Sequence, residues 1–275
     1  MTAELSDCDF GKIRRFMYET YGINLHDGKK ELVRARLGRR LRQGKFGSFT
    51  EYLDFVTGTG GVDELTAMID SLSTNLTGFF REENHFDCLR RIIADMTESA
   101  RSLPMLRIWC AGCSTGEEAY SLAMTVREHL KVQNCATRIV ATDISTRVLR
   151  TAVKGVYRAD RIGSIPDALV KKYFQIGSGT RRGYYRVKKD LRDMVTFERF
   201  NLMDTPPFRD SFDTIFCRNV MIYFDKKTQE RLIARLYDAL ETGGWLFIGH
   251  SESLTGMQHR FTYVEPNVYR KGENR

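Results

Sequence analysis

The chain has 275 residues, of which 42% are hydrophobic and 28% are charged, and its formal net charge is +8. These values exclude a disordered chain and allow one large domain, or a medium-sized domain with a small one. No apolar run approaches the roughly 20 residues of a membrane span, and the acidic start of the chain lacks the apolar stretch of a signal peptide. We therefore expect a cytoplasmic protein that does not insert into a membrane.

The first 70 residues predict an all-helical domain. One helical face is marked by Phe10, Ile13, Phe16 and Met17. A second face, in the next helix, is marked by Leu32, Val33, Leu37 and Leu41. Glycine-containing breaks near residues 44–48 and 58–61 separate two further helices.

The second predicted helix is strongly basic. The segment from Lys29 to Lys45 holds eight basic residues and one acid. Its apolar positions leave Arg36, Arg39 and Arg40 around the other sides of the helix. Such a positive face attracts nucleic acid, a membrane surface or an acidic protein, and the alternative is an ordinary solvated helix face.

Residues 71–85 are expected to connect this domain to the next. The segment places Phe79, Phe80 and Arg81 among polar residues, which is unusual for a plain linker. It is either a packed hinge or a segment that closes over a ligand site.

From residue 86 onward, strands and helices alternate, as in an α/β sheet. The pattern predicts helices at 86–98, after Glu117, and at 227–241 with a stop at Gly243–Gly244. It predicts strands at 106–110, 138–142, 194–197, 213–217 and 245–248, and a terminal hairpin formed by 261–264 and 268–270.

An insert at about 155–190 interrupts this alternation. Two short β-prone runs flank a loop that contains Gly177, Gly179 and Gly183. We expect a small antiparallel element at the edge of the sheet. An exposed edge strand can bind a peptide by β-augmentation.

The six cysteines are expected to be reduced thiols. Cys110 and Cys113 form a CxxC pair, but a zinc site would need a second pair or nearby histidines, and the sequence offers neither at suitable spacing. No metal is therefore expected. A thioredoxin-like redox pair is the alternative.

The most informative stretch runs from Arg107 to Asp143. Its pattern predicts, in order, a strand, a glycine-containing turn, a helix and a second strand that ends in an acid. This order is typical of a nucleoside site in which the acid binds ribose hydroxyls. The turn lacks the first glycine of a dinucleotide motif. Glu117 and Glu118 also stand where a pyrophosphate would dock, and their charges would repel it. The pair favours a cationic ligand such as S-adenosylmethionine, although Ser114 and Glu117 have the spacing of a helix capping box, which gives Glu117 a purely structural alternative.

Several motifs in order resemble the CheR family of chemotaxis receptor methyltransferases. They are Thr-Gly-Phe-Phe-Arg-Glu at 77–82, Ser-Thr-Gly-Glu-Glu at 114–118, Ala-Thr-Asp-Ile at 141–144, Phe-Asn-Leu at 200–202, Cys-Arg-Asn-Val-Met-Ile-Tyr-Phe at 217–224 and Gly-His-Ser-Glu at 249–252. The likeness covers essentially the whole chain. It implies a Rossmann-like class I S-adenosylmethionine-dependent methyltransferase sheet with a terminal β-hairpin and an antiparallel insert. The expected parts are a helical domain at 1–70, a connector at 71–85 and a methyltransferase domain at 86–275.

The resemblance also implies roles for individual residues. Asn75, Thr77 and Arg81 would contact the donor, Glu117 would lie near its methionyl end, Asp143 would hold the ribose, Asn201 and Leu202 would flank the adenine, and Arg218 and Asn219 would complete the pocket floor. Arg81 and Tyr223 are the nearest to a catalytic pair. In some relatives the equivalent of the insert grips a peptide tether at the receptor C-terminus, which would give Gly177, Gly179 and Gly183 a docking role.

The implied reaction methylates glutamate side chains in the cytoplasmic domain of methyl-accepting chemotaxis receptors and leaves S-adenosylhomocysteine. A glutamate carboxylate, with a reference pKa of about 4.3, is already ionised at neutral pH. No general base is then needed, and the enzyme must align the reactants and exclude water. Receptor helices rich in glutamate would dock on the face that carries Arg36, Arg39 and Arg40. We expect a monomer.

Two other functions remain open from the sequence. A nucleic-acid methyltransferase would suit a basic domain, but Thr205-Pro-Pro-Phe208 differs from the Asn/Asp-Pro-Pro-Tyr/Phe motif and precedes the strand that the motif should follow. Because of this mismatch, nucleic acid is not expected as a partner. The second alternative is a non-catalytic sensor of the donor, which would keep Asp143 and Glu117 without turnover.

Overall fold

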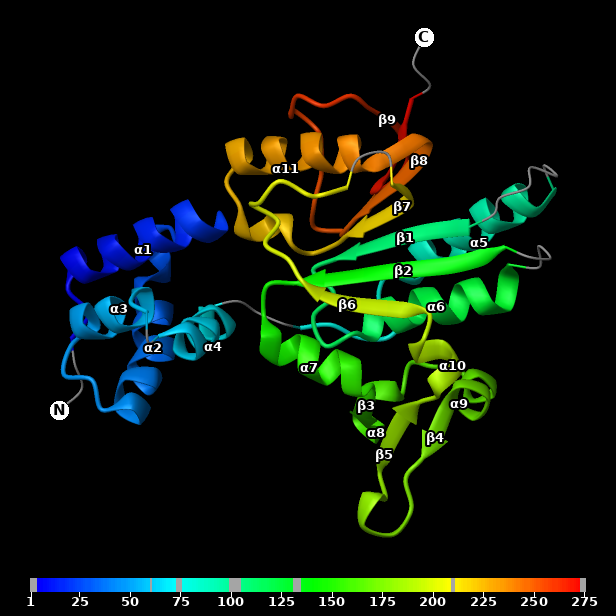
Figure 1. Ribbon diagram of the computed structural model, residues 1–275. Coiled ribbons are helices and arrows are strands. Elements are labelled where there is room, and N and C mark those ends of the chain that lie inside the picture. The colour runs from blue at the N-terminus through cyan, green and yellow to red at the C-terminus, as the bar shows by residue number, and fades with distance from the viewer. Residues whose placement is uncertain are drawn as a thin grey trace.

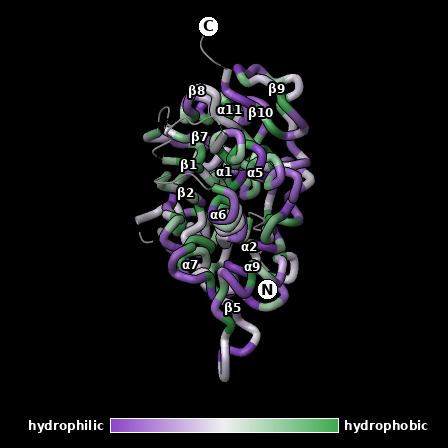
Figure 2. Tube along the Cα trace, turned by 90° about the vertical axis from the view of Figure 1, so that its right-hand side faces the viewer, coloured by the Kyte–Doolittle hydropathy of each residue, from purple (hydrophilic) through white to green (hydrophobic). Residues whose placement is uncertain are grey.

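The computed structural model describes residues 4–59, 61–72, 76–98, 105–130, 135–208 and 211–272. Figure 1 shows a helical bundle on one side, a large twisted sheet in the middle and a small sheet that projects from one end. The projection and the last described strands of the chain also lie at opposite ends in the turned view of Figure 2. Within these ranges, no helix combines the length and the apolar character of a bilayer-spanning segment.

The N-terminal helices pack around a core of their own, as their periodicity predicts. They are α1 (Asp7–Tyr21), α2 (Lys30–Gly44), α3 (Phe49–Thr57) and α4 (Val62–Leu72), with a 3-10 turn η1 (Asp27–Lys29) before α2. Ser6 and Ser48 cap α1 and α3 by accepting hydrogen bonds from Asp9 N and Glu51 N. The predicted apolar faces are buried, with Ile13, Met17, Val33 and Leu37 fully enclosed.

The large sheet has seven strands in the order β6-β2-β1-β7-β8-β10-β9. The strands are β1 (Met105–Ala111), β2 (Ala136–Asp143), β6 (Val195–Arg199), β7 (Phe212–Cys217), β8 (Leu240–Ile248), β9 (Phe261–Glu265) and β10 (Val268–Lys271). The first five are parallel, and β10 pairs antiparallel with both β8 and β9. This is the predicted class I methyltransferase sheet with its terminal hairpin. The chain reverses direction across the sheet between β1 and β7, so the carboxyl ends of these strands form the expected ligand crevice.

Each face of the sheet is covered because side chains alternate along the strands. In β1, Ile108 and Cys110 face the core shared with α5 (Glu83–Glu98) and α6 (Glu117–His129). Trp109 and Ala111 face the other core, shared with α11 (Lys226–Ala239). Helix α7 (Thr146–Lys154) follows β2.

The predicted stop of the last helix at Gly243–Gly244 is wrong. Helix α11 ends at Ala239, and the chain enters β8 directly at Leu240. The glycines instead lie inside β8, beside a register shift in its pairing with β7. A Cβ at Gly244 would lie 2.9 Å from the carbonyl oxygen of Glu241, so the pair allows an irregular strand rather than ending a helix.

The insert forms a small antiparallel sheet, as predicted, but with a third strand. Its order is β3 (Val156–Arg158), β5 (Tyr184–Val187) and β4 (Phe174–Ile176). The short helices α8 (Ala159–Ile162), α9 (Asp167–Tyr173) and α10 (Lys189–Arg192) complete it, and a turn η2 (Gly179–Arg181) lies at its tip. Phe79 of the connector packs edge-to-face on Tyr157 and Phe174, which joins the connector to this sheet.

One buried carboxylate holds the loop after β7 against the end of β8. Glu252 accepts backbone hydrogen bonds from Gly249 N (2.6 Å), Asn219 N (3.0 Å) and Met221 N (2.7 Å). Asn219 itself adopts a left-handed backbone conformation, with φ +57°. Met221 begins the 3-10 turn η3 (Met221–Tyr223), so Glu252 fixes the backbone that carries Tyr223.

We predict that Glu252→Gln lowers the free energy of unfolding by about 2 kcal/mol, because an amide NH₂ would face backbone N–H donors. Urea denaturation measures this change. Glu198→Gln, on an exposed position of β6, is the matched control and should change the stability little. Equal stability of both variants would contradict the role of Glu252.

Candidate functional site

A cleft opens at the carboxyl ends of the parallel strands. This is where α/β sheets bind ligands. The cleft contains eight residues predicted for the site, which are Thr77, Arg81, Asp143, Asn201, Leu202, Arg218, Asn219 and Tyr223. Asn75 lies outside the described residues.

The turn after β1 forms one wall of the cleft. Gly112 (φ +82°), Ser114 (φ +49°) and Gly116 (φ +95°) all have left-handed backbones. A Cβ at Gly112 would lie 2.4 Å from a methyl group of Val220, so a larger residue there would collide with the loop after β7. Gly112 is needed for this close approach.

Asp143 stands at the end of β2 with its carboxylate held by the turn. Its Oδ2 accepts from Ser114 N and its Oδ1 from Ser145 N, both at 2.9 Å. Burial, assisted by the charge of Asp70, raises the pKa of Asp143 above its usual value although these N–H groups work in the opposite direction. Because each oxygen has a second lone pair, the fixed carboxylate can still accept two hydroxyl hydrogen bonds.

The acid on the cleft wall is Glu118 and not Glu117, which the sequence analysis had placed near the donor. Glu118 is among the lining residues and Glu117 is not. Glu117 is fully buried, ion-paired with Arg161 and bonded by the Thr115 hydroxyl. The capping-box alternative fails too, because Gly116 is the N-cap of α6 and no side chain caps it. The sequence alone could not show which of these two neighbouring acids in the first turn of α6 lines the cleft.

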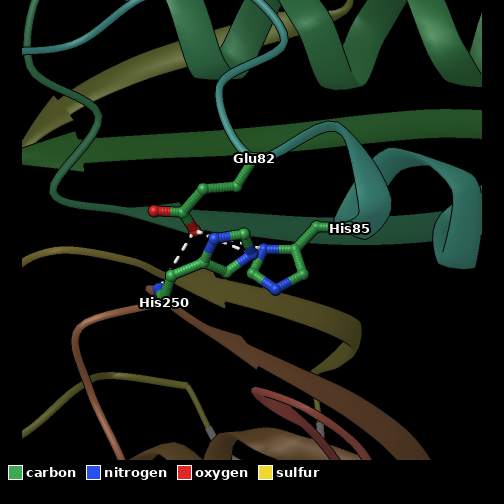
Figure 3. A group of neighbouring side chains, drawn as sticks. All are labelled: Glu82, His85 and His250. Atoms are coloured by element: carbon green, nitrogen blue, oxygen red, sulfur yellow. Dashed lines mark hydrogen bonds and ion pairs between the residues drawn. The ribbon is translucent and has the colours of Figure 1, made fainter.

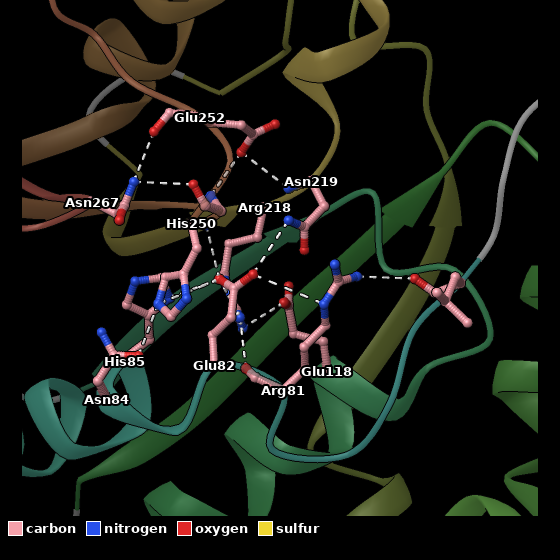
Figure 4. A network of polar contacts seen from close by, with 12 residues as sticks. Arg81, Glu82, Asn84, His85, Glu118, Arg218, Asn219, His250, Glu252 and Asn267 are labelled. Carbon is pink, nitrogen blue, oxygen red and sulfur yellow. Dashed lines mark hydrogen bonds and ion pairs between the residues drawn. The ribbon is translucent and has the colours of Figure 1, made fainter.

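Arg218 joins three elements beneath the cleft (Figure 4). Its guanidinium, 1% exposed, lies 2.8 Å from Glu82 Oε2 and 2.9 Å from Glu118 Oε2. It also donates to the carbonyl oxygen of Arg81 at 2.6 Å. Burial tends to raise the pKa of Glu82, but the hydrogen bond and charge of Arg218 outweigh it and leave the pKa lowered. The sequence indicated Arg218, Glu118 and Arg81 as site residues but not that they contact one another.

The connector therefore reaches the cleft in a constrained conformation. Phe80 (φ +51°) and Glu82 (φ +58°) both have left-handed backbones on either side of Arg81. The Arg81 side chain, 40% exposed, donates from one nitrogen to the carbonyl oxygen of Leu76 at 3.0 Å and points into the cleft. The carbonyl oxygen of Thr77 is bound by Arg161. Of the two readings of the connector, these contacts favour a segment that closes over the site.

The buried thiols do not support the redox alternative. Cys110 and Cys113 are free, fully enclosed cysteines. Burial, with the charges of nearby carboxylates, raises the pKa of both thiols well above the usual value. Neither is therefore a ready thiolate nucleophile.

Glu82, His85 and His250 form a cluster with metal-ligand chemistry (Figure 3). Glu82 Oε2 lies 3.6 Å from His85 Nδ1 and 3.9 Å from His250 Nε2. That oxygen is already the partner of Arg218, however, and burial together with the Arg218 charge lowers the pKa of His85 to about 4. The same positive field opposes a divalent cation, and the Glu82 carboxylate is already ion-paired with Arg218.

The predicted docking residues do not line the cleft, and their side chains differ in their contacts within the bundle. Arg40 is ion-paired with Glu64 at 2.5 Å, and Arg36 donates to the carbonyl oxygens of Ser71 and Leu72. Arg39 is exposed on the same helix.

The predicted glycines belong to the connection between β4 and β5. A Cβ at Gly177 would lie 2.1 Å from the carbonyl oxygen of Arg181, and Gly179 (φ +55°) and Gly183 (φ +84°) have left-handed backbones. They shape the loop, which leaves β4 as an edge strand with Ile176 62% exposed.

Comparison with known proteins identifies the family. The "CheR methyltransferase, SAM binding domain" model matches residues 75–270, and the "CheR methyltransferase, all-alpha domain" model matches residues 9–73. The chain is 42% identical to "Chemotaxis protein methyltransferase 2" of Pseudomonas aeruginosa, over 95% of this chain and 92% of that protein. It is 40% identical to "Chemotaxis protein methyltransferase" of Borreliella burgdorferi (96% and 94% covered) and to that of Escherichia coli (96% and 91% covered). Both parts of the chain are matched in order, and the cleft lies at the carboxyl ends of the parallel strands, where it was predicted. The chain therefore belongs to the CheR methyltransferase family.

Proposed function

We propose that the protein transfers methyl groups from S-adenosylmethionine to glutamate side chains in the cytoplasmic domain of chemotaxis receptors. The observation that carries this proposal is that one cleft holds both the Asp143 carboxylate and the side chains of Arg81 and Tyr223. The proposal further takes the protein to act as a monomer, since one chain provides all of these groups, and to need no metal or nucleic acid.

The residues of the cleft fit the donor. Asp143 would hold the ribose hydroxyls, and Glu118 would face the ammonium of the methionyl end, a role first assigned to Glu117. Apolar side chains near Asn201 and Leu202 suit an adenine ring. When bound, the donor supplies an electrophilic methyl group on a sulfonium.

Arg81 and Tyr223 are the proposed groups on the acceptor side. Arg81 would orient the ionised acceptor carboxylate by charge-assisted hydrogen bonds, and Tyr223 would hydrogen-bond it or line its path. Since the carboxylate is already a nucleophile, the work of the protein is alignment and exclusion of water. The immobilised loop after β7, held by Glu252, supports Tyr223 in this role.

The receptor is proposed to dock on α2, chiefly through Arg39, with Arg36 and Arg40 closer to the bundle. The edge strand β4 is the proposed site for a C-terminal tether peptide, because its exposed Ile176 and unpaired backbone suit β-augmentation. Gly177, Gly179 and Gly183 would then act by shaping the loop beside the peptide.

Transfer of labelled methyl groups tests the proposed function. Incubation of the protein with labelled donor and receptor-containing membranes should give base-labile label on the receptors. Label in nucleic acid would instead favour the nucleic-acid methyltransferase, and donor binding without any transfer would favour the sensor.

We predict that Asp143→Asn weakens S-adenosylhomocysteine binding at least about tenfold, because each charge-assisted hydrogen bond contributes about 1.5–3 kcal/mol. Isothermal titration calorimetry measures the dissociation constant. Asp160→Asn, on exposed α8, is the control. Unchanged affinity in Asp143→Asn would remove Asp143 from the ribose site.

We predict that Arg81→Ala and Tyr223→Phe each lower kcat for receptor methylation about tenfold or more, because each removes a group that aligns the acceptor. Steady-state kinetics at saturating donor measures kcat. If both variants kept wild-type kcat and donor affinity, the assignment of this pair would be wrong.

We predict that Arg39→Glu raises the KM for receptor about fivefold at low salt and leaves donor affinity unchanged, because it reverses a charge on the proposed docking face. The effect should shrink as ionic strength rises. Arg138→Glu, exposed at the start of β2, is the matched control. An equal KM for the two variants would place the receptor elsewhere.

A further inference from the structure

A buried imidazole next to the cleft has no hydrogen-bond partner. His85, in the first turn of α5, is fully enclosed, and neither of its ring nitrogens forms a hydrogen bond with the described part of the chain. Its ring packs edge-to-face on Phe247 and on the ring of His250. Buried polar groups are almost always paired, so these nitrogens need an explanation. The proposed methyl transfer does not use them.

Two further ligand atoms lie close to this ring, on the connector and on the loop after β8 (Figure 3). Glu82 Oε2 lies 3.6 Å from His85 Nδ1 and 3.9 Å from His250 Nε2, and one ligand atom from each residue lies within 4.8 Å of the other two. Tetrahedral Zn²⁺ with bonds of about 2.0–2.2 Å places neighbouring ligand atoms about 3.4 Å apart. Small side-chain rotations therefore bring the three atoms to the spacing of a zinc site.

An ion at this site would compete with existing contacts. Glu82 Oε2 already accepts from Arg218 and, at 3.2 Å, from His250 N, which uses both of its lone pairs. His250 Nε2 is hydrogen-bonded to Asn84 Oδ1 at 2.9 Å. These contacts and the charge of Arg218 make the site weak, so it does not hold an ion on which the fold depends. Two imidazoles favour Zn²⁺ over Mg²⁺ and Ca²⁺, which prefer oxygen ligands.

The same contacts connect the cluster to the cleft (Figure 4). Glu82 Oε1 accepts from Asn219 Nδ2 at 3.3 Å, and Arg218 and Asn219 both line the cleft. An ion bound to Glu82 takes part of its negative charge from Arg218 and adds a positive charge nearby. The guanidinium then holds the connector less firmly at the place where the donor is proposed to bind.

We propose that Glu82, His85 and His250 form an inhibitory site for Zn²⁺. The ion takes no part in methyl transfer, and it opposes the donor by loosening the contact between Glu82 and Arg218. Zn²⁺ and donor therefore lower the affinity of each other by the same factor, because binding linkage is reciprocal. Binding of the ion is independent of the proposed function, whereas its inhibitory effect rests on it.

Calorimetry with Zn²⁺ alone tests the site without an enzyme assay. His85→Phe and His250→Ala should each weaken Zn²⁺ binding about tenfold or more, since each removes one of three ligands. His85→Phe keeps a ring in the core and removes no hydrogen bond, so it should fold. His259→Ala, exposed just before β9 and outside the cluster, is the matched control and should bind Zn²⁺ like the unmodified protein.

Calorimetry with S-adenosylhomocysteine tests the inhibitory effect. Saturating Zn²⁺ should weaken its binding to the unmodified protein about fivefold or more, and the same concentration of Mg²⁺ should not. His85→Phe should bind it equally well with and without Zn²⁺. Zn²⁺ binding that survives both substitutions, or S-adenosylhomocysteine affinity that does not respond to bound Zn²⁺, would overturn the inference and leave the proposed function intact. Failure of the zinc-free protein to bind S-adenosylhomocysteine would instead contradict the proposed function.

Discussion

The site depends on one buried guanidinium. Arg218 lies between the carboxylates of Glu82 and Glu118 and also binds the carbonyl oxygen of Arg81. These groups come from the loop after β7, the connector and α6, so three segments far apart in the sequence meet at one positive charge. Removing one partner from a buried charge pair is costly. The two acids would also repel each other without the arginine between them, so the arrangement is sensitive to any change in this group.

A second level of organisation comes from backbone contacts around the loop after β7. Glu252 holds this loop from the side of β8, and Asn24 holds it from the side of the bundle. Tyr223 accepts the Asn24 hydrogen bond on its own carbonyl oxygen and lies two residues after Met221, which donates to Glu252. The helical bundle is consequently both the proposed receptor-docking domain and a support for the edge of the sheet that carries the cleft, which gives a physical reason for the two parts to occur in one chain.

The sequence predicted the strands and helices well because their hydrophobic periodicity is regular, and it placed Asp143 and Arg218 at the ends of the correct strands. It failed where periodicity carries no information. The Gly243–Gly244 pair could end a helix or kink a strand, and only the pairing of β8 with β7 decides between them. Glu117 and Glu118 could not be ranked, because the direction of each side chain depends on Arg161 and Arg218, which are distant in sequence. The positions of Tyr21 and Ile23 in the lining of the cleft depend on how the bundle packs on the sheet, which no local pattern encodes.

We infer that Arg218 unites the proposed donor and acceptor sides of the cleft. The most direct test is the dissociation constant of Arg218→Lys for S-adenosylhomocysteine, measured by calorimetry on protein whose folding is verified by circular dichroism. Lysine keeps the charge but lacks the planar fork that contacts two carboxylates and a carbonyl oxygen at once. We expect a folded variant that binds at least about tenfold more weakly. A folded Arg218→Lys with the affinity of the unmodified protein would contradict it.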